Sequence, residues 1–294
     1  VNGERVFERT QDLKIENLKV IKDYLSDITE QNADSVNEIA KNSLNQEELF
    51  LTNGFKLIFS PKFTKLIVDW FTNKFMVIYR ADSMQLIKRF ADPKKKAIYV
   101  EKTTDEAAKL FGINSNAVGY VVSDDEPDAK LYSVFKNMKN KKTTAVAADI
   151  FESYGTIRFI NMFPLVIKAM QTGGTLVVDE FDASIHPMAL MSIINVFHND
   201  DVNIHHAQLI FNTHNPIFLN SNLFRRDEIK FVERDDDTHD SVLYALSDFG
   251  TTGDKGVRKH EDYMSKYFIS QYGAIKDIDF TPIFEEILDS EREV

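Results

Sequence analysis

The chain has 294 residues, with 35 Lys plus Arg against 46 Asp plus Glu, and its formal net charge is −11. That length supports one large domain or two modest ones. The chain contains no cysteine, which excludes a disulfide scaffold, a thiolate metal site and a cysteine nucleophile. The acidic balance argues against a broad nucleic-acid groove as the dominant surface. No apolar run approaches the ~20 residues that cross a bilayer, and we expect a cytoplasmic protein with no membrane segment.

The first third of the chain predicts a mainly helical region. Asn2-Gly3 is a strong hairpin signal, but one residue precedes it, so we expect the chain to begin inside a hairpin. Apolar residues at helical spacing predict a helix over Ile15–Thr29, and residues 30–43 allow a weaker second helix. Phe63–Lys74 again has a helical pattern. The apolar run Phe75–Tyr79 after it indicates a short buried strand.

The pattern is sharper from Ala145 onward. A helix opens near Ser153, and Pro164 within it predicts a kink. Gly173-Gly174 ends this helix. The run Thr175–Val178 that follows is continuous and β-rich, as in sheets that are covered on both faces.

A second strand is predicted at Gln208–Asn212, after a helix that begins at Pro187. Strand, crossover helix and strand form a βαβ unit, so the two strands should be parallel with a right-handed connection. Their carboxyl ends then share one edge of the sheet, where open α/β sheets bind ligands. Further on, Ile229–Val232 and Ser241–Tyr244 predict an antiparallel hairpin, and residues 267–294 are expected to be partly helical and peripheral.

Three groups of polar residues lie where these elements begin or end. Ser153, Gly155 and Thr156 open a helix, and a helix N-terminus offers N–H groups and a hydroxyl to an anion such as phosphate. Asp179-Glu180 follows one strand; the first carboxylate is suited to hold hydrated Mg²⁺ and the second to orient water. His214 follows the next strand and is placed to reach a phosphate. Each group taken alone also fits an ordinary cap or a solvated strand end.

The order of these motifs resembles the C-terminal half of ABC-type ATPase heads. The similarity is to the SMC/OLD-like defence ATPases of the AAA15 or AAA21 type, whose relatives include the RloA, AbiL and Septu PtuA proteins. It is carried by a signature-like segment, a Walker B-like segment, a D-loop-like segment and a switch-histidine segment, namely Glu152–Thr156 with Arg158, Leu176–Glu180, Asp182–Pro187 and Asn212–Pro216. The resemblance implies an α/β P-loop NTPase fold with parallel core strands, flanking helices and a C-terminal antiparallel hairpin.

The resemblance also implies a role for each matched residue. Asp179 would bind Mg²⁺ through water, Glu180 would be the catalytic carboxylate and His214 would sense the γ-phosphate of ATP. Ser153, Gly155 and Thr156 would cap a nucleotide held mainly by a second protomer. Ser184 and His186 would lie at the subunit boundary. ATP should then favour a closed homodimer or higher homo-oligomer, and hydrolysis should open it.

The sequence departs from the family in one respect. No Gly-x-x-x-x-Gly-Lys-Ser/Thr motif occurs in the 294 residues, and without that loop the β- and γ-phosphates lack their main cradle. We therefore interpret residues 145–294 as the C-terminal lobe of the head, and residues 1–144 as a helical insert with the remainder of the N-terminal lobe. We expect this chain alone to be inactive and to be a fragment that follows the Walker A lobe.

Other functions fit parts of the pattern. The chain could be a non-catalytic interaction subunit that kept the fold and lost turnover. An OLD-type nuclease has too little room, because 80 residues follow His214. A zinc site from three histidines, His198, His205 and His206, lacks a spaced pair on one helix face. The family resemblance implies phage defence with a separate effector such as a nuclease. Neither the trigger, nor the effector, nor DNA binding follows from the sequence.

Overall fold

The computed structural model describes most of the chain from residue 142 onward and parts of the region before it. The described residues are 4–9, 13–26, 36, 38, 42, 54–79, 97–100, 102–113, 115–122, 129–137, 142–252, 256–276 and 278–292. The predicted Asn2-Gly3 turn and most of the weaker helix at 30–43 lie outside them, and Val36, Glu38 and Asn42 within that stretch are helical. No described helix is long and apolar enough to cross a membrane.

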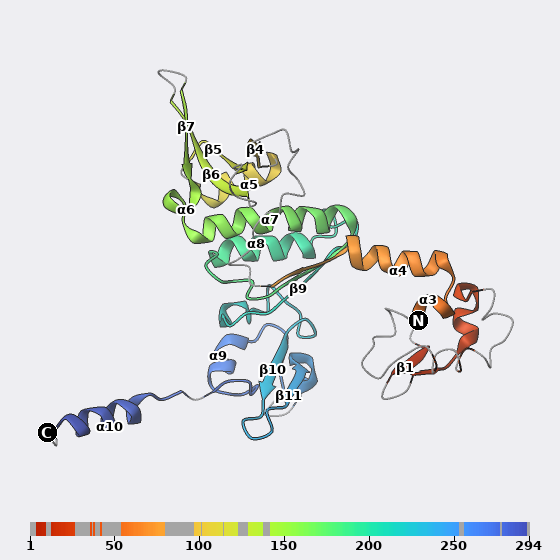
Figure 1. Ribbon diagram of the computed structural model, residues 1–294. Coiled ribbons are helices and arrows are strands. Elements are labelled where there is room, and N and C mark those ends of the chain that lie inside the picture. The colour runs from red at the N-terminus through yellow and green to blue at the C-terminus, as the bar shows by residue number, and fades with distance from the viewer. Residues whose placement is uncertain are drawn as a thin grey trace.

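A parallel sheet forms the centre of the molecule (Figure 1). Its described strands are β3 (Phe75–Ile78), β8 (Thr175–Val178) and β9 (Gln208–Phe211), in the order β3-β8-β9. Val178 is aligned with Ile78 on one side and with Phe211 on the other, so all three strands end at the same level. The predicted parallel βαβ unit and the mixed α/β fold are confirmed.

Helices α7 (Tyr154–Thr172) and α8 (Pro187–His198) cover one face of this sheet (Figure 1). The core between them is made of fully buried apolar side chains, among them Met162, Val166, Leu176, Val178, Leu190 and Ile194. The helix ends agree with the sequence signals, because Pro187 is the first residue of α8 and Gly173 adopts the left-handed conformation (φ 62°) that ends α7. Helix α7 runs through Pro164, and the kink expected there stays a prediction.

The opposite face of the sheet is more open than the sequence predicts. Val77, Val177 and Ile210 are aligned across the three strands on this face. The side chains at its two flanks, Val77 and Ile210, are 36% and 54% exposed. The expectation holds for β8 itself, whose four residues are buried or half-buried, but not for the flanking strands, because a buried centre does not require the whole sheet face to be covered.

The N-terminal region differs from the predicted long helix. Strands β1 (Phe7–Arg9) and β2 (Leu13–Ile15) form an antiparallel hairpin, and a 3-10 helix, η1 (Leu18–Tyr24), follows. Ile15 is thus in a strand. Asn17 takes a left-handed conformation (φ 42°), which prevents a continuous helix from Ile15 into η1. The predicted helix at Phe63–Lys74 is confirmed as α4 (Pro61–Asn73), preceded by the short α3 (Gly54–Ile58).

A second sheet occupies part of the region that was predicted to be mainly helical. Strands β4 (Ala97–Tyr99), β5 (Ala117–Val122), β6 (Ala129–Lys136) and β7 (Thr143–Ala147) pair in antiparallel order, with α5 (Lys102–Phe111) and α6 (Ala148–Phe151) beside them. Helix α5 packs on α7, where Phe111 and Phe159 stack with their ring centroids 4.7 Å apart. Strand β7 crosses the predicted boundary at 144/145 and pairs with β6, so that boundary divides a sheet.

The C-terminal part forms a small core of its own. The predicted hairpin is confirmed as β10 (Lys230–Arg234) and β11 (Ser241–Ala245), and it packs with α9 (Tyr263–Phe268), near the 3-10 helices η4 (Pro216–Phe218) and η5 (Leu246–Phe249). Tyr263 and Tyr272 are each 1% exposed in this core. The tail is therefore not peripheral up to about Tyr272, whereas the last helix, α10 (Thr281–Arg292), stands apart (Figure 1).

Two tyrosines of this core should ionise late. Burial, reinforced by nearby acids, raises the pKa of Tyr244 and of Tyr272 to about 12, against 10.0 for a free tyrosine. Folding therefore stabilises the neutral phenols. This contribution is complete below pH 10 and is lost as the pH rises toward 12. We expect tyrosinate absorbance to show a late-titrating fraction in the folded protein and none in urea. A single transition near pH 10 in both states would contradict this.

Candidate functional site

The carboxyl ends of β8 and β9 bring the acidic pair and the histidine to one edge of the sheet. Asp179 and Glu180 follow β8 directly, and His214 follows β9 by three residues. Asp179 is half-buried, whereas Glu180 and His214 are exposed. The parallel register places these loops next to each other. A carboxylate pair and an imidazole are thus available to a ligand at this edge.

Asn212 joins the two loops. Its Nδ2 donates a hydrogen bond of 2.6 Å to Asp179 Oδ1, and its Oδ1 accepts one of 2.6 Å from the Glu180 backbone N–H. The Asn212 carbonyl also accepts from the Phe181 N–H at 3.2 Å. Asn212 lies in the switch-histidine segment, but the sequence indicated no role for it. An amide side chain carries both a donor and an acceptor. Asn212 uses its donor to hold the Asp179 carboxylate and its acceptor to hold the Glu180 backbone.

Replacing Asn212 with Ala should loosen this edge. The variant loses both side-chain hydrogen bonds, which are solvent-exposed. We therefore expect the free energy of unfolding, measured in urea, to fall by about 1 kcal/mol. Asn212→Asp is the matched comparison. It keeps an acceptor for the Glu180 N–H but sets a second carboxylate against Asp179, so it should be no more stable than the Ala variant. A full-stability Asp variant would show that the bond to Asp179 contributes nothing.

The backbone of Glu180 is held in an uncommon conformation. Its φ is +49°, in the left-handed region that costs an L-residue roughly 1 kcal/mol. The guanidinium of Arg158, on α7, donates to the Glu180 carbonyl oxygen. Arg158 is 2% exposed, and a buried guanidinium needs such polar partners. The bond therefore connects the signature-like helix to the acidic loop.

The signature-like turn at the start of α7 is tightly packed. Ser153 caps the helix, with its Oγ accepting from the Thr156 N–H at 3.1 Å and lying 2.8 Å from Thr156 Oγ1. Gly155 is buried, and a Cβ built on it would lie 2.0 Å from the carbonyl oxygen of Ser184. The structure thus brings the signature-like and D-loop-like segments into contact. Ser153 is exposed, while Gly155 has a packing role.

A buried acid anchors the same turn to the antiparallel sheet. Glu152, directly before Ser153, is 7% exposed and accepts a 2.8 Å hydrogen bond from the Oγ of Ser133 on β6. The sequence analysis assigned Glu152 no separate role. The pairing partner is 19 residues away in sequence, so no local pattern could have indicated it.

The D-loop-like segment ends in a cap for α8. His186 is exposed, and its Nδ1 accepts a 3.2 Å hydrogen bond from the Met188 N–H. Ser184, also exposed, has a positive φ of 64°. A histidine that accepts at Nδ1 is in the state without a proton there. His186 therefore has a local helix-capping function.

The histidines that sequence analysis weighed for zinc do not converge. Within the described ranges, which include residues 142–252, no three His, Asp or Glu side chains are grouped as metal ligands. His198 instead pairs with Glu228, with Nε2 and Oε1 3.4 Å apart. Asp179 is therefore not part of a cluster of three such ligands among the described residues. It suits a hydrated Mg²⁺, which commonly takes one or two protein carboxylates together with phosphate oxygens.

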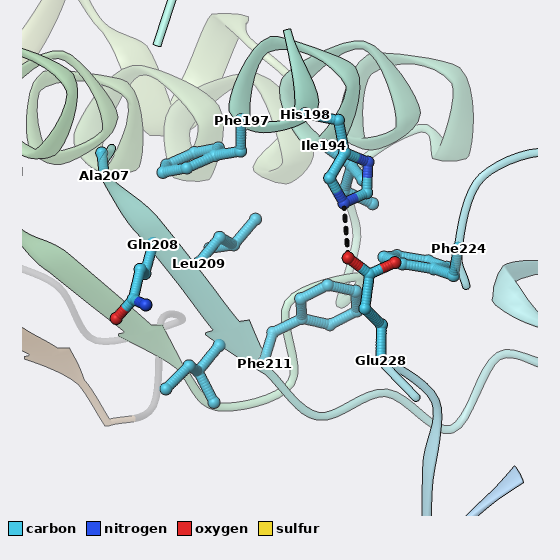
Figure 2. Close-up of a pocket in the computed structure, with 10 residues that line it drawn as sticks. Ile194, Phe197, His198, Ala207, Gln208, Leu209, Phe211, Phe224 and Glu228 are labelled. Atoms are coloured by element: carbon cyan, nitrogen blue, oxygen red, sulfur yellow. Dashed lines mark ion pairs between the residues drawn. The ribbon is translucent and has the colours of Figure 1, made fainter. Parts of the chain in front are cut away.

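A cavity of about 280 Å³ runs beside β9, and the His198–Glu228 pair lies at it (Figure 2). Phe197, Phe211 and Phe224 contribute much of its apolar lining. All four residues of β9, Gln208–Phe211, line the cavity. Because alternate strand residues point to opposite faces, a cavity lined by four in a row follows the edge of the strand. β9 is also one of the two edge strands of the sheet in the part of the chain that the structure describes.

A comparison with known families identifies the family of this chain. The AAA_21 model, an AAA domain described as AbiEii toxin-like and of type IV toxin–antitoxin systems, matches residues 16–220. The chain belongs to this AAA family. The match includes the parallel sheet, the acidic pair and His214, and the parallel sheet with its hairpin is consistent with a P-loop NTPase-like fold. Membership in the AAA family supports an ATPase-type function and nucleotide binding. No curated protein and no solved structure matches the chain.

Proposed function

We propose that this chain is the catalytic and signature part of an ATP-hydrolysing, ABC-type ATPase. The observation that supports this most directly is the hydrogen-bonded edge at which Asn212 binds Asp179 and the backbone of Glu180. A fixed carboxylate beside an exposed one allows the two to take different tasks. The family match supports a nucleotide ligand, and this edge would provide the groups that bind its metal ion and orient the attacking water.

The roles divide according to exposure and contacts. Asp179 would bind the water shell of Mg²⁺, which neutralises phosphate charge, while Asn212 holds its carboxylate in place. Glu180, which is exposed, would orient the water that attacks the γ-phosphorus and accept its proton. His214 would donate a hydrogen bond to the γ-phosphate. These assignments make the chemistry depend on positioned charges rather than on a covalent intermediate.

The signature-like turn would act on a nucleotide held by a second copy. Ser153 is exposed at the N-terminus of α7, where a helix favours an anion. Ser184 and His186 are exposed on the adjacent loop and would meet the other subunit. Gly155 supports this surface from beneath, because it lets the Ser184 carbonyl approach. ATP binding would then close a homodimer and hydrolysis would open it.

The phosphate-binding loop is expected to come from a segment outside these 294 residues, which contain no Gly-x-x-x-x-Gly-Lys-Ser/Thr motif. The edge of β9 offers a place for the strand that carries it, because the cavity of Figure 2 follows this edge. A strand parallel to β9 would end beside Asn212 and His214. Its loop would then face the same ligand as Asp179.

Family membership also supports a biological role. The family description refers to an AbiEii-like toxin of a type IV toxin–antitoxin system, and we propose that the ATPase cycle controls a separate effector, such as a nuclease, in anti-phage defence. The alternative is a non-catalytic interaction subunit. The missing phosphate-loop motif favours that alternative, and the presence of Glu180 and His214 opposes it.

Nucleotide binding and turnover test the proposal. ATP affinity and phosphate release would be measured for the 294-residue chain and for the product of its complete gene, each with Mg²⁺. We expect no turnover from the chain alone, and turnover once a phosphate-binding loop is present. Tight ATP binding without any hydrolysis in the complete gene product would favour the interaction subunit. No ATP binding by the complete product would overturn the proposal.

A further inference from the structure

The turn from Glu180 to Ser184, which follows β8, has a backbone conformation that its residue types disfavour. Glu180 and Ser184, the two ends of the turn, have positive φ values of 49° and 64°, a region that residues other than glycine rarely adopt. Phe181 within the turn is fully buried, and its ring packs on Phe211 of β9. Such a conformation persists only where the surrounding contacts impose it, and it is found most often at functional sites.

Both polar groups of the Glu180 backbone are bound by side chains from other parts of the fold. The Glu180 N–H donates to Asn212 Oδ1, directly after β9, at 2.6 Å. The Glu180 carbonyl oxygen accepts from the guanidinium of Arg158 on α7, and also from the Ala183 N–H at 3.1 Å. A residue has only two soft backbone torsions. Holding the N–H and the carbonyl therefore fixes the direction in which the Glu180 side chain leaves the backbone.

Helix α7 contacts both ends of this turn. Arg158 donates to the Glu180 carbonyl oxygen at the first end. At the other end, Gly155 packs against the Ser184 carbonyl oxygen so closely that an added Cβ would lie 2.0 Å from it. Gly155 and Arg158 are both buried, and their spacing of three residues places them on one face of the helix. The start of α7 and the Glu180–Ser184 turn therefore pack as one unit, in which Arg158 reaches Glu180.

We propose that Arg158 is a positioning residue for Glu180, whose carbonyl it holds so that the carboxylate faces the attacking water. The proposal rests on the proposed role of Glu180 in ATP hydrolysis. Arg158 is 2% exposed, so it would act through Glu180 and not by contact with the nucleotide. A guanidinium suits this task because its donors have fixed directions and it stays charged. Since a misplacement of about 1 Å can cost 10²-fold in rate, loss of this bond should lower turnover and leave ATP affinity intact.

Turnover and ATP binding by the complete gene product test this role. Arg158→Met keeps a long side chain without a donor, and we expect kcat to fall by roughly 10–10²-fold with the Kd for ATP unchanged. Arg158→Lys keeps a cationic donor and should recover part of the loss. Tyr120→Phe is the matched control, because it removes the 2.5 Å hydrogen bond from Tyr120 to Asn161 elsewhere on α7 and should leave kcat unchanged. A wild-type kcat in Arg158→Met, or an equal loss in Tyr120→Phe, would overturn the proposal.

A double variant separates positioning from general damage to the fold. If Arg158 acts through the Glu180 carboxylate, Arg158→Met should reduce the residual turnover of a Glu180→Gln protein much less than it reduces that of the wild type. The reason is that the carboxylate it positions is already gone. Two independent roles would instead multiply the two losses, and that result would contradict a positioning role.

Amide hydrogen exchange without nucleotide distinguishes failure of this proposal from failure of the proposed function. The Phe181 and Ala183 N–H groups are hydrogen-bonded in the turn, and Arg158→Met should speed their exchange, whereas Tyr120→Phe should not. Unchanged exchange in Arg158→Met would refute the positioning role. Faster exchange together with wild-type turnover by Glu180→Gln would keep Arg158 as the support of the turn and refute the catalytic role of Glu180. If circular dichroism shows that Arg158→Met does not fold, Arg158→Lys takes its place in each measurement.

Discussion

Replacing Glu180 with Gln is expected to lower ATP hydrolysis by roughly 10²–10⁴-fold while ATP binding persists. The amide keeps the size of the side chain but cannot accept a proton from the attacking water. Asp179, Asn212 and His214 are unchanged, so Mg²⁺ and phosphate contacts should remain. The measurement is phosphate release by the complete gene product with saturating ATP and Mg²⁺. Because the variant stops the cycle after binding, it should also accumulate in the ATP-bound dimer.

The control is Glu106→Gln, which removes an exposed carboxylate on α5 that pairs with Lys102 at 3.6 Å. It should leave the rate unchanged. If Glu180→Gln hydrolyses ATP at the wild-type rate, Glu180 is not the catalytic carboxylate. If the variant fails to bind ATP as well, Glu180 has a structural role at this edge.

Gly155→Ala is expected to destabilise the protein by about 1–3 kcal/mol, the usual range for overpacking a closed site. The added Cβ would lie 2.0 Å from the backbone carbonyl oxygen of Ser184, a separation that real Cβ atoms do not adopt. The backbone on one side of this contact must therefore move, and we expect the turn at Ser184 to move first. Urea unfolding followed by circular dichroism measures the loss.

Tyr154→Ala is the matched variant at the neighbouring position. Tyr154 is 48% exposed, and Ala is the better helix former, so its stability should stay within about 0.5 kcal/mol of wild type. A Gly155→Ala protein of wild-type stability would mean that the Ser184 turn relaxes without cost. The contact between the signature-like and D-loop-like segments would then not be rigid.

The sequence determined the elements of the parallel unit and the order of its motifs. The run Thr175–Val178, the Ser153 cap, Pro187 and Gly173 are local signals, since each depends on the spacing or conformational preference of neighbouring residues. These local signals also predict where strands β8 and β9 end. Parallel strands joined by one crossover helix must end at the same edge, so Asp179, Glu180 and His214 could be placed there without coordinates.

Local signals failed where a non-local contact or a conformational break decided the outcome. Apolar spacing predicted a helix at Ile15–Thr29, but pairing with β1 made Ile15 part of a strand, and Asn17 broke the helical path. The antiparallel sheet β4–β7 was not predicted. Its strands pair with their neighbours in sequence, but short strands are specified mainly by how their side chains pack on the surrounding structure, which strand propensity does not report.

Only the tertiary structure decided how the site is held. Asn212 bonds Asp179 from 33 residues away, Arg158 bonds the Glu180 carbonyl from 22, and Gly155 closes on Ser184. The same holds for the open sheet face beside Ile210. Periodicity and caps report how a residue relates to its near neighbours. Which distant surfaces meet depends on how whole elements pack, and that information is in the folded arrangement.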